Sequence, residues 1–348
     1  DVESRGLGDV YKRQDVPGYA TLVQKNTLES LDDYITDVGI NLADFNGITD
    51  QVTVDGSLYE LPFRSDYWLI YYNKDVFDAA GIAYPSNDMT MEDYDALARQ
   101  LTDTTYGSQV YGCHYHTWRS AVELFGILDG KHSILDGNYD WMIPYYDMIL
   151  SEEDDGVCQT YTDLSTEGLH YSAAFSNGNV AMMNMGSWFI STLISNLDSG
   201  EYDSSLCGNW GIASYPHPDG AEAGSTIATI TGLAVTSASA NKDAAFDFVN
   251  WVSGTEGAKV MASTGNFPAI MTDDVINTIA GMAGFPTDES SKEALNITNA
   301  YLEVPYAENV SEINSILDTY HISIMNREVT VEAVSYTHLR AHETRRHL

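Results

Sequence analysis

The clearest pattern in the chain is an apolar run over residues 67–72, which has no polar position inside it. A run of this kind predicts a strand covered on both faces, as in a mostly parallel sheet with helices on each side. Asn73 follows as a helix-capping residue, and Gly81 can end the short helix in the left-handed conformation. Before the run, the Asp-Gly pair at 55–56 predicts a small hairpin.

Short apolar runs alternate with amphipathic stretches along the rest of the chain. Thr90 and Asp93 form the pattern of a capping box, which predicts a helix to about Leu101. Further strands are predicted at 109–113, 180–185, 210–214 and 226–236, and further helices at 19–35, 118–128, 141–150, 164–175, 241–252 and from 269 to about 325. This alternation predicts an α/β fold with mostly parallel sheets, built from discontinuous segments where the chain crosses between lobes.

A series of short motifs follows the same course. It begins with Tyr59-Glu60-Leu61-Pro62, Tyr71-Tyr72-Asn73-Lys74-Asp75-Val76-Phe77 and Ala80-Gly81, and continues with Phe175-x-x-Gly178-x-Val180-Ala181-Met182-x-x-x-Gly186-x-Trp188, Trp210-Gly211 through Pro216, Thr231-Gly232-Leu233-Ala234-Val235 and Ala245-Phe246-x-Phe248-Val249-x-Trp251. In this order the motifs resemble those of the extracellular solute-binding proteins of ABC sugar importers, the group that includes maltose-binding protein. The resemblance spans roughly residues 15–334, and Glu60 stands where the family usually has glycine.

The resemblance implies a periplasmic-binding-protein-like fold of type II, in which two lobes with mostly parallel sheets are joined by a hinge. It implies a function as well: capture of an oligosaccharide in the cleft between the lobes by hinge closure, without catalysis. The implied partners are the permease subunits of an ABC importer. A monomer is expected outside the cytoplasm, either free in the periplasm or anchored as a lipoprotein, and no cofactor is expected.

The same resemblance sets the expected domain boundaries. Lobe 1 is expected at 15–109 and 230–300, and lobe 2 at 110–229 and 301–334. Residues 1–14 and 335–348 resemble translated sequencing-adapter sequence, a contaminant of assembled metagenomic reads, and are left out of the fold prediction. Family members begin with a signal peptide, a first strand and a βαβ unit ahead of the matched region, so lobe 1 is expected to be incomplete.

Composition narrows the class of partner. The chain has 348 residues, 44% of them hydrophobic, which is enough for two lobes with a core each. Its formal net charge of −35 repels nucleic acid and anionic membranes. The same charge suits a neutral or cationic ligand and a protein outside the cell. No apolar run reaches the roughly 18 residues that a membrane span needs.

Metal and nucleotide sites find little support in the sequence. Cys113, Cys158 and Cys207 include no close-spaced pair, so a zinc knuckle is not predicted. One disulfide with one free thiol, and three buried thiols, both stay open. His114 and His116 could share one face of a strand, but no third ligand lies nearby, and no metal is predicted. The chain has no Gly-x-Gly-x-x-Gly, Walker loop or nucleophile elbow.

Aromatic residues supply the candidate ligand contacts. Aromatic faces suit the apolar C–H surfaces of sugars, and strand-to-helix junctions line the crevice in α/β folds. Trp188 matches the family's sugar-stacking tryptophan, and Trp118 matches an aromatic at the start of a second-lobe helix. Trp210 and Trp251 are assigned to the core. The predicted binding residues are Asp66, Tyr67, His116, Trp118, Trp188, Gly232 and Phe267.

Two other functions remain open from the sequence. A secreted carbohydrate-active enzyme would use a pair of carboxylates, which the many acidic residues could supply. A binder of a cationic ligand such as a polyamine would use Asp66 and the acidic field. Incubation with an oligosaccharide separates these classes, because an importer component leaves the sugar intact.

Overall fold

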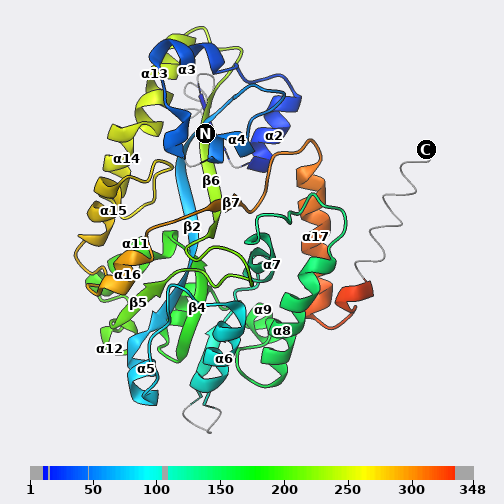
Figure 1. Ribbon diagram of the computed structural model, residues 1–348, viewed down its shortest axis with the longest axis vertical. Helices are drawn as coiled ribbons and strands as arrows, with labels where there is room; N and C mark the ends of the chain where they lie inside the picture. Colours follow the sequence, from blue (N-terminus) through cyan, green and yellow to red (C-terminus); the bar gives the residue numbers. More distant parts are fainter. Residues whose placement is uncertain (1–10, 15, 46, 104–108, 334–348) are drawn as a thin grey trace.

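One long strand runs through the middle of the molecule. The computed structural model describes residues 11–14, 16–45, 47–103 and 109–333. Strand β2 (Leu61–Asn73) extends along the centre, and helices cover the strands on both sides (Figure 1). The apolar run predicted from the sequence is the second half of this strand, and it is buried throughout.

Strand β2 changes its partners halfway along. Its first half, to Tyr67, pairs with β6 (Thr226–Val235), and its second half, from Trp68, pairs with β4 (Val180–Gly186) and β5 (Trp210–Ala213). Beside β6 lie β1 (Tyr11–Gln14) and β7 (Ala300–Leu302), and beside β4 lies β3 (Tyr111–His114). The result is a seven-stranded sheet with two halves that share β2.

The strand directions correct one expectation. The α/β fold is confirmed, but only β3–β4 and β6–β7 are parallel, whereas β2 is antiparallel to β4, β5 and β6, and β1 is antiparallel to β6. The apolar run indicated burial on both faces, and that burial comes from the flanking helices. It does not fix strand direction, because an antiparallel strand under two helical layers has the same pattern.

Two hydrophobic cores lie on opposite faces of β2. Leu69 and Tyr71 belong to one core, and Ile70 and Tyr72 belong to the other. Successive side chains of a strand point to opposite faces, so six consecutive apolar residues are needed to serve both cores. This geometry explains why the run in the sequence shows no alternation.

Helices make up most of the remaining described chain. Those around the β1–β6–β7 half and along the α11 side are α2 (Val16–Gln24), α3 (Asp32–Val38), η1 (Leu42–Phe45), α4 (Ile48–Gln51), α11 (Trp188–Ser199), α12 (Ser204–Cys207), α13 (Lys242–Ser253), α14 (Thr255–Ala262), α15 (Asp273–Ala280) and α16 (Glu289–Glu293). The others are α5 (Lys74–Ala80), α6 (Met91–Leu101), α7 (Ser120–Ile127), η2 (Asp140–Met142), α8 (Ile143–Asp154), α9 (Tyr161–Glu167), α10 (Tyr171–Ser176) and α17 (Val310–Met325). The helix predicted at 164–175 is two helices, because Gly168 ends α9 in the left-handed region at φ 62°.

The start of the chain corrects a second expectation. Residues 1–14 were left out of the fold prediction, yet Tyr11–Gln14 pair with Gly232–Val235 of β6. These four residues therefore belong to the sheet. Residues 1–10 and 334–348, which hold the rest of the adapter-like segments, lie outside the described residues.

The predicted lobe boundaries stay a prediction, but packing adds information about one of them. Helix α6 packs on β3, and α5 packs on β4 and β5. Residues 74–101 therefore contact the half of the sheet that was expected to belong to lobe 2, although the first boundary was expected at 109/110. The backbone already passes between the two halves at Tyr67–Trp68 of β2.

Candidate ligand-binding site

The junction between β4 and α11 is tied to the middle of β2. The Ser187 hydroxyl donates to Asp66 Oδ1 at 3.1 Å and accepts from the Tyr67 backbone N–H at 3.2 Å. The Ser187 backbone N–H donates to the Tyr67 carbonyl oxygen at 2.8 Å. These three bonds fix the start of α11 at the point where β2 changes its partners.

Asp66 is buried and held on two sides. Arg64 Nε lies 2.6 Å from Asp66 Oδ2, and Arg64 Nη2 donates to Asp66 Oδ1 at 3.1 Å. Ser187 supplies the third contact. The carboxylate is thus already paired in this conformation, and it positions Ser187 and the helix that follows.

Tyr67 and Phe267 lie beneath the surface. Both side chains are almost fully buried, and their rings meet edge to face with centroids 6.1 Å apart. Burial raises the pKa of Tyr67 to about 12, so its phenol stays protonated at neutral pH. In this conformation the two rings pack against each other close to Tyr67–Trp68, where β2 changes its partners. We call this point the strand crossing.

Three of the predicted residues, His116, Trp118 and Trp188, form one aromatic group with Trp68. The half-buried Trp188 ring lies 5.7 Å from the Trp68 ring and 6.2 Å from the Trp118 ring, centroid to centroid. Trp118 is 41% exposed and lies 4.6 Å from the His116 ring. Burial, with a smaller contribution from His170, lowers the pKa of His116 to about 4, so this imidazole is neutral at physiological pH.

Gly186 makes the placement of Trp188 sterically feasible. A Cβ atom at Gly186 would lie 2.1 Å from the Trp188 indole ring. The missing side chain lets the indole fold back over the end of β4. Each residue of the motif Gly-Ser-Trp therefore has its own role. Gly186 leaves space for the indole, Ser187 forms hydrogen bonds to β2, and Trp188 supplies the aromatic ring.

Gly232 lies elsewhere. It sits in β6 opposite Pro62 and Gln14, and a Cβ atom there would lie 2.4 Å from the carboxyl group of Glu60. The glycine makes room for this buried glutamate. The structure therefore groups Asp66, Tyr67, His116, Trp118, Trp188 and Phe267 around the strand crossing and places Gly232 apart from them.

Several residues beside the group were not predicted. Glu303, next to the end of β7, accepts hydrogen bonds from Thr229 Oγ1 at 2.8 Å and from the Ser120 hydroxyl. A cavity of about 270 Å³ lies beside them and is lined by Trp118, Ser120, Glu303, Asn314 and Asp318, among others. Ser187 could have been found from its place between a strand and Trp188. Glu303 carries no such signal, because one acidic residue after a short strand is common in this acidic chain.

The comparisons with known proteins agree on the family. The family model for bacterial extracellular solute-binding proteins matches residues 3–259. A sugar transporter from Rhizobium etli, crystallised in an open conformation, is 45% identical, with a TM-score of 0.90; the alignment covers 94% of this chain and 83% of that one. No curated protein matches this chain.

More distant structures share the fold. An ABC substrate-binding protein from Listeria monocytogenes in complex with cycloalternan is 21% identical, with a TM-score of 0.74 over 94% of this chain and 82% of that one. Maltose-bound MalE3 from T. maritima is 19% identical, with a TM-score of 0.72 over 95% and 83%.

The family match begins at residue 3, inside the segment that was left out of the fold prediction. It extends through β6 and α13, so it includes the strand crossing and all of the aromatic group. Within the described residues, no helix is long and apolar enough to cross a membrane. The predicted family and the periplasmic-binding-protein-like fold are confirmed, and the chain belongs to the bacterial extracellular solute-binding proteins.

Proposed function

We propose that this protein is the oligosaccharide-binding component of an ABC importer. The observation that carries the proposal is the group of Trp68, Trp118 and Trp188 at the strand crossing. The exposed indole surface of Trp118 and Trp188 suits the apolar faces of sugar rings, whereas Trp68 is buried and packs against Trp188. Polar groups beside the rings can orient hydroxyls. The 45% identical sugar transporter supports a sugar as the ligand.

The sheet supports closure of the cleft by a hinge. Strand β2 passes between the two halves at Tyr67–Trp68, and β6 and β7 run beside it, with Ala228 paired to both Tyr67 and Leu302. Three adjacent strands therefore link the halves. We place the crossings at 67–68, 227–228 and 302–303, so that residues 74–101 move with β3, β4 and β5. A narrow connection of this kind lets a ligand that contacts both halves favour the closed form.

The neighbours of Trp118 suggest how sugar hydroxyls are held. Glu303, Asn314 and Asp318 line the cavity next to this ring with oxygen atoms that can accept hydrogen bonds. In this conformation Arg119, which also lines the cavity, donates to Asn314 and Asp318. An aromatic face beside several carboxylate and amide acceptors matches a neutral, hydroxyl-rich ligand. The two roles are then separate: the indoles supply apolar contact area and the acceptors fix orientation.

Replacement of Trp188 tests the binding site. We expect Trp188→Ala to weaken binding of a recognised oligosaccharide by about 1–3 kcal/mol, the scale for removing a buried aromatic anchor. Isothermal titration with a panel of maltose-, mannose- and cycloalternan-type sugars measures this. Trp251→Ala is the matched control, because Trp251 is 53% exposed on α13, away from the crossing, which corrects its expected place in the core. If the parent and Trp188→Ala bind the sugar with equal affinity, Trp188 is not part of the binding site.

Small-angle scattering tests the motion. We expect the radius of gyration to fall when the recognised sugar saturates the protein, and the sugar to be recovered unchanged. No compaction at saturation would contradict hinge closure, and cleavage of the sugar would favour a carbohydrate-active enzyme instead. The permease partner, the monomeric state and a location outside the cytoplasm, either free in the periplasm or anchored as a lipoprotein, belong to the same proposal.

A further inference from the structure

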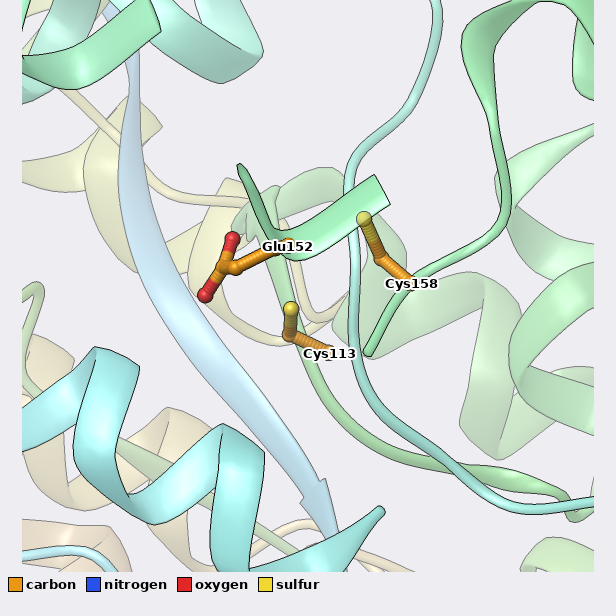
Figure 2. A group of neighbouring side chains, drawn as sticks. All are labelled: Cys113, Glu152 and Cys158. Atoms are coloured by element: carbon orange, nitrogen blue, oxygen red, sulfur yellow. The ribbon is translucent and has the colours of Figure 1, made fainter. Parts of the chain in front are cut away.

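A second cluster of polar side chains lies inside the molecule, away from the aromatic group. It contains Cys113 of β3, Glu152 of α8 and Cys158 of the segment after α8, and Figure 2 shows them next to one another. The two sulfur atoms and a carboxylate oxygen all lie within 4.8 Å of one another. Among the described residues, this is the one group of three or more cysteine, histidine or acidic side chains that is compact enough to hold a metal ion.

The backbone holds the three segments together. The Gly112 N–H donates to the Val157 carbonyl oxygen at 2.9 Å, and the Val157 N–H donates to the Glu152 carbonyl oxygen at 2.8 Å. The Cys113 N–H also points at the Val157 carbonyl, at 3.4 Å. The side chains are therefore brought together by hydrogen bonds of their own segments, whether or not anything binds between them.

The cluster is buried and contains a carboxyl group that burial keeps mostly protonated at neutral pH. Cys113 and Glu152 have no exposed surface, and Cys158 has almost none. No well-aligned hydrogen bond reaches either carboxylate oxygen of Glu152, but the Tyr115 hydroxyl and the Asp95 carboxyl group lie close to it. Burial dominates and raises the pKa of Glu152 to about 8. A buried carboxyl group without well-aligned hydrogen bonds is costly, and a bound cation is one way in which proteins offset that cost.

We propose that Cys113, Cys158 and Glu152 bind one zinc ion. Two thiolates select a soft or borderline metal over calcium or magnesium, and a carboxylate oxygen is an accepted third ligand for zinc. Ligands of a tetrahedral zinc lie about 3.3–3.8 Å apart, so no separation in the cluster has to contract by more than about 1 Å on binding. The thiol protons and any carboxyl proton leave as the metal binds.

These three side chains leave the fourth ligand of a tetrahedral zinc to another group. The Tyr115 side chain is buried, and its hydroxyl lies close to Cys113 and Glu152. It is placed to receive a hydrogen bond from a water molecule bound to the metal, or to donate one. A zinc ion here would join β3 to α8 and the following segment, which stabilises one half of the molecule and touches no residue of the aromatic group.

A disulfide is the competing use of the two cysteines. Its formation removes two protons and two electrons from Cys113 and Cys158 and passes them to an oxidant, such as the disulfide of a thiol oxidase outside the cytoplasm. A disulfide joins the two cysteines and leaves the buried Glu152 carboxyl group unused, whereas a metal ion uses all three side chains. Glu152 is therefore the reason to prefer the metal.

The test compares the protein refolded with zinc and with a chelator. We expect one zinc per chain by mass spectrometry of the metal after gel filtration, and cobalt substitution should give thiolate-to-cobalt charge-transfer absorption. Glu152→Gln should weaken zinc binding at least about tenfold. Cys113→Ser and Cys158→Ser should abolish it. Cys207→Ser is the matched control, because Cys207 is also fully buried but lies outside the cluster, and it should keep the zinc.

Glu152→Gln keeps the test decisive if the serine variants fail to fold. With zinc in place, the glutamine variant loses a ligand and should melt at a lower temperature than the parent. Without a metal site, the same change replaces a buried carboxyl group by a neutral amide and raises the melting temperature. A higher melting temperature, absence of zinc after refolding with it, or a Cys113–Cys158 disulfide in the peptide map would each overturn the proposal.

Discussion

Acidification should destabilise the protein through two buried histidines. His114 of β3 and His321 of α17 are nearly inaccessible to solvent, and burial lowers the pKa of each to about 3. His116 adds repulsion to His114, and Arg119 adds repulsion to His321. An unfolded histidine has a pKa of about 6.5. Below that pH the histidines of the unfolded chain are protonated, whereas those of the folded chain stay neutral. The free energy of unfolding therefore falls as the pH drops from about 6.5 toward 3.

The size of the effect follows from the two pKa values. At about pH 5, each histidine costs roughly 2 kcal/mol, because the unfolded ring is mostly protonated and the folded ring is not. The pair therefore costs about 4 kcal/mol relative to neutral pH. For a chain of this length, 1 kcal/mol corresponds to roughly 1.5 °C in Tm, which gives a fall of about 6 °C from these two side chains.

Thermal melts of a single variant isolate one half of this effect. In His321→Asn the amide can still accept from the Tyr146 hydroxyl, which lies 2.9 Å from His321 Nδ1. We expect the fall in Tm between about pH 7.5 and about pH 5 to be about 3 °C smaller in this variant than in the parent. His170→Asn, at an exposed helix cap, is the control and should leave the difference unchanged. An equal fall in the parent and in His321→Asn would refute the reasoning.

Two further substitutions test the packing of α6 on β3 and the buried charge beside the ligand cavity. Gly112→Ala places a Cβ atom 1.7 Å from the Ala98 carbonyl oxygen, so α6 and β3 have to separate; we expect a loss of about 3 kcal/mol or more in urea denaturation, and an unchanged midpoint would contradict this packing. Arg119→Met leaves the fully buried Glu123 without its cation and should cost about 3–5 kcal/mol, whereas Arg119→Met combined with Glu123→Leu should recover most of it; a double variant as unstable as the single one would show that the buried charge is not the cause.

The sequence predicted local structure well because the signals are local. Asn73 accepts a hydrogen bond from the Asp75 N–H at 3.1 Å, and Gly81 ends α5 at φ 68°, as the pattern indicated. Thr90 and Asp93 form the predicted capping box of α6. Each of these devices depends on residues within four positions of one another, so the chain alone specifies them.

Predictions failed where distant segments decide the outcome. The Asp-Gly turn at 55–56 forms, but the expected hairpin is a single bridge between Val54 and Ser57, because the next strand takes its partners elsewhere. The direction of β2 relative to its neighbours was also not predictable, because its partner strands lie more than 100 residues further along the chain. Cys113 and Cys158 were judged by their spacing, and the Val157 carbonyl that joins their segments has no signature in the sequence.

The crossing in β2 shows why site and hinge could not be separated from the sequence. Asp66 and Tyr67 were predicted as ligand contacts because they precede a buried strand. In the structure they are the last residues paired to β6, and Ser187 binds both of them across the change of partners. A residue where β2 changes its partners affects ligand binding and lobe closure together. A ligand that moves α11 also changes the three hydrogen bonds that join Ser187 to Asp66 and Tyr67. Substitution of Asp66 therefore changes the balance of open and closed forms even if Asp66 never touches the sugar, whereas Trp188 changes affinity through contact. Comparing scattering with affinity for the two variants separates the roles.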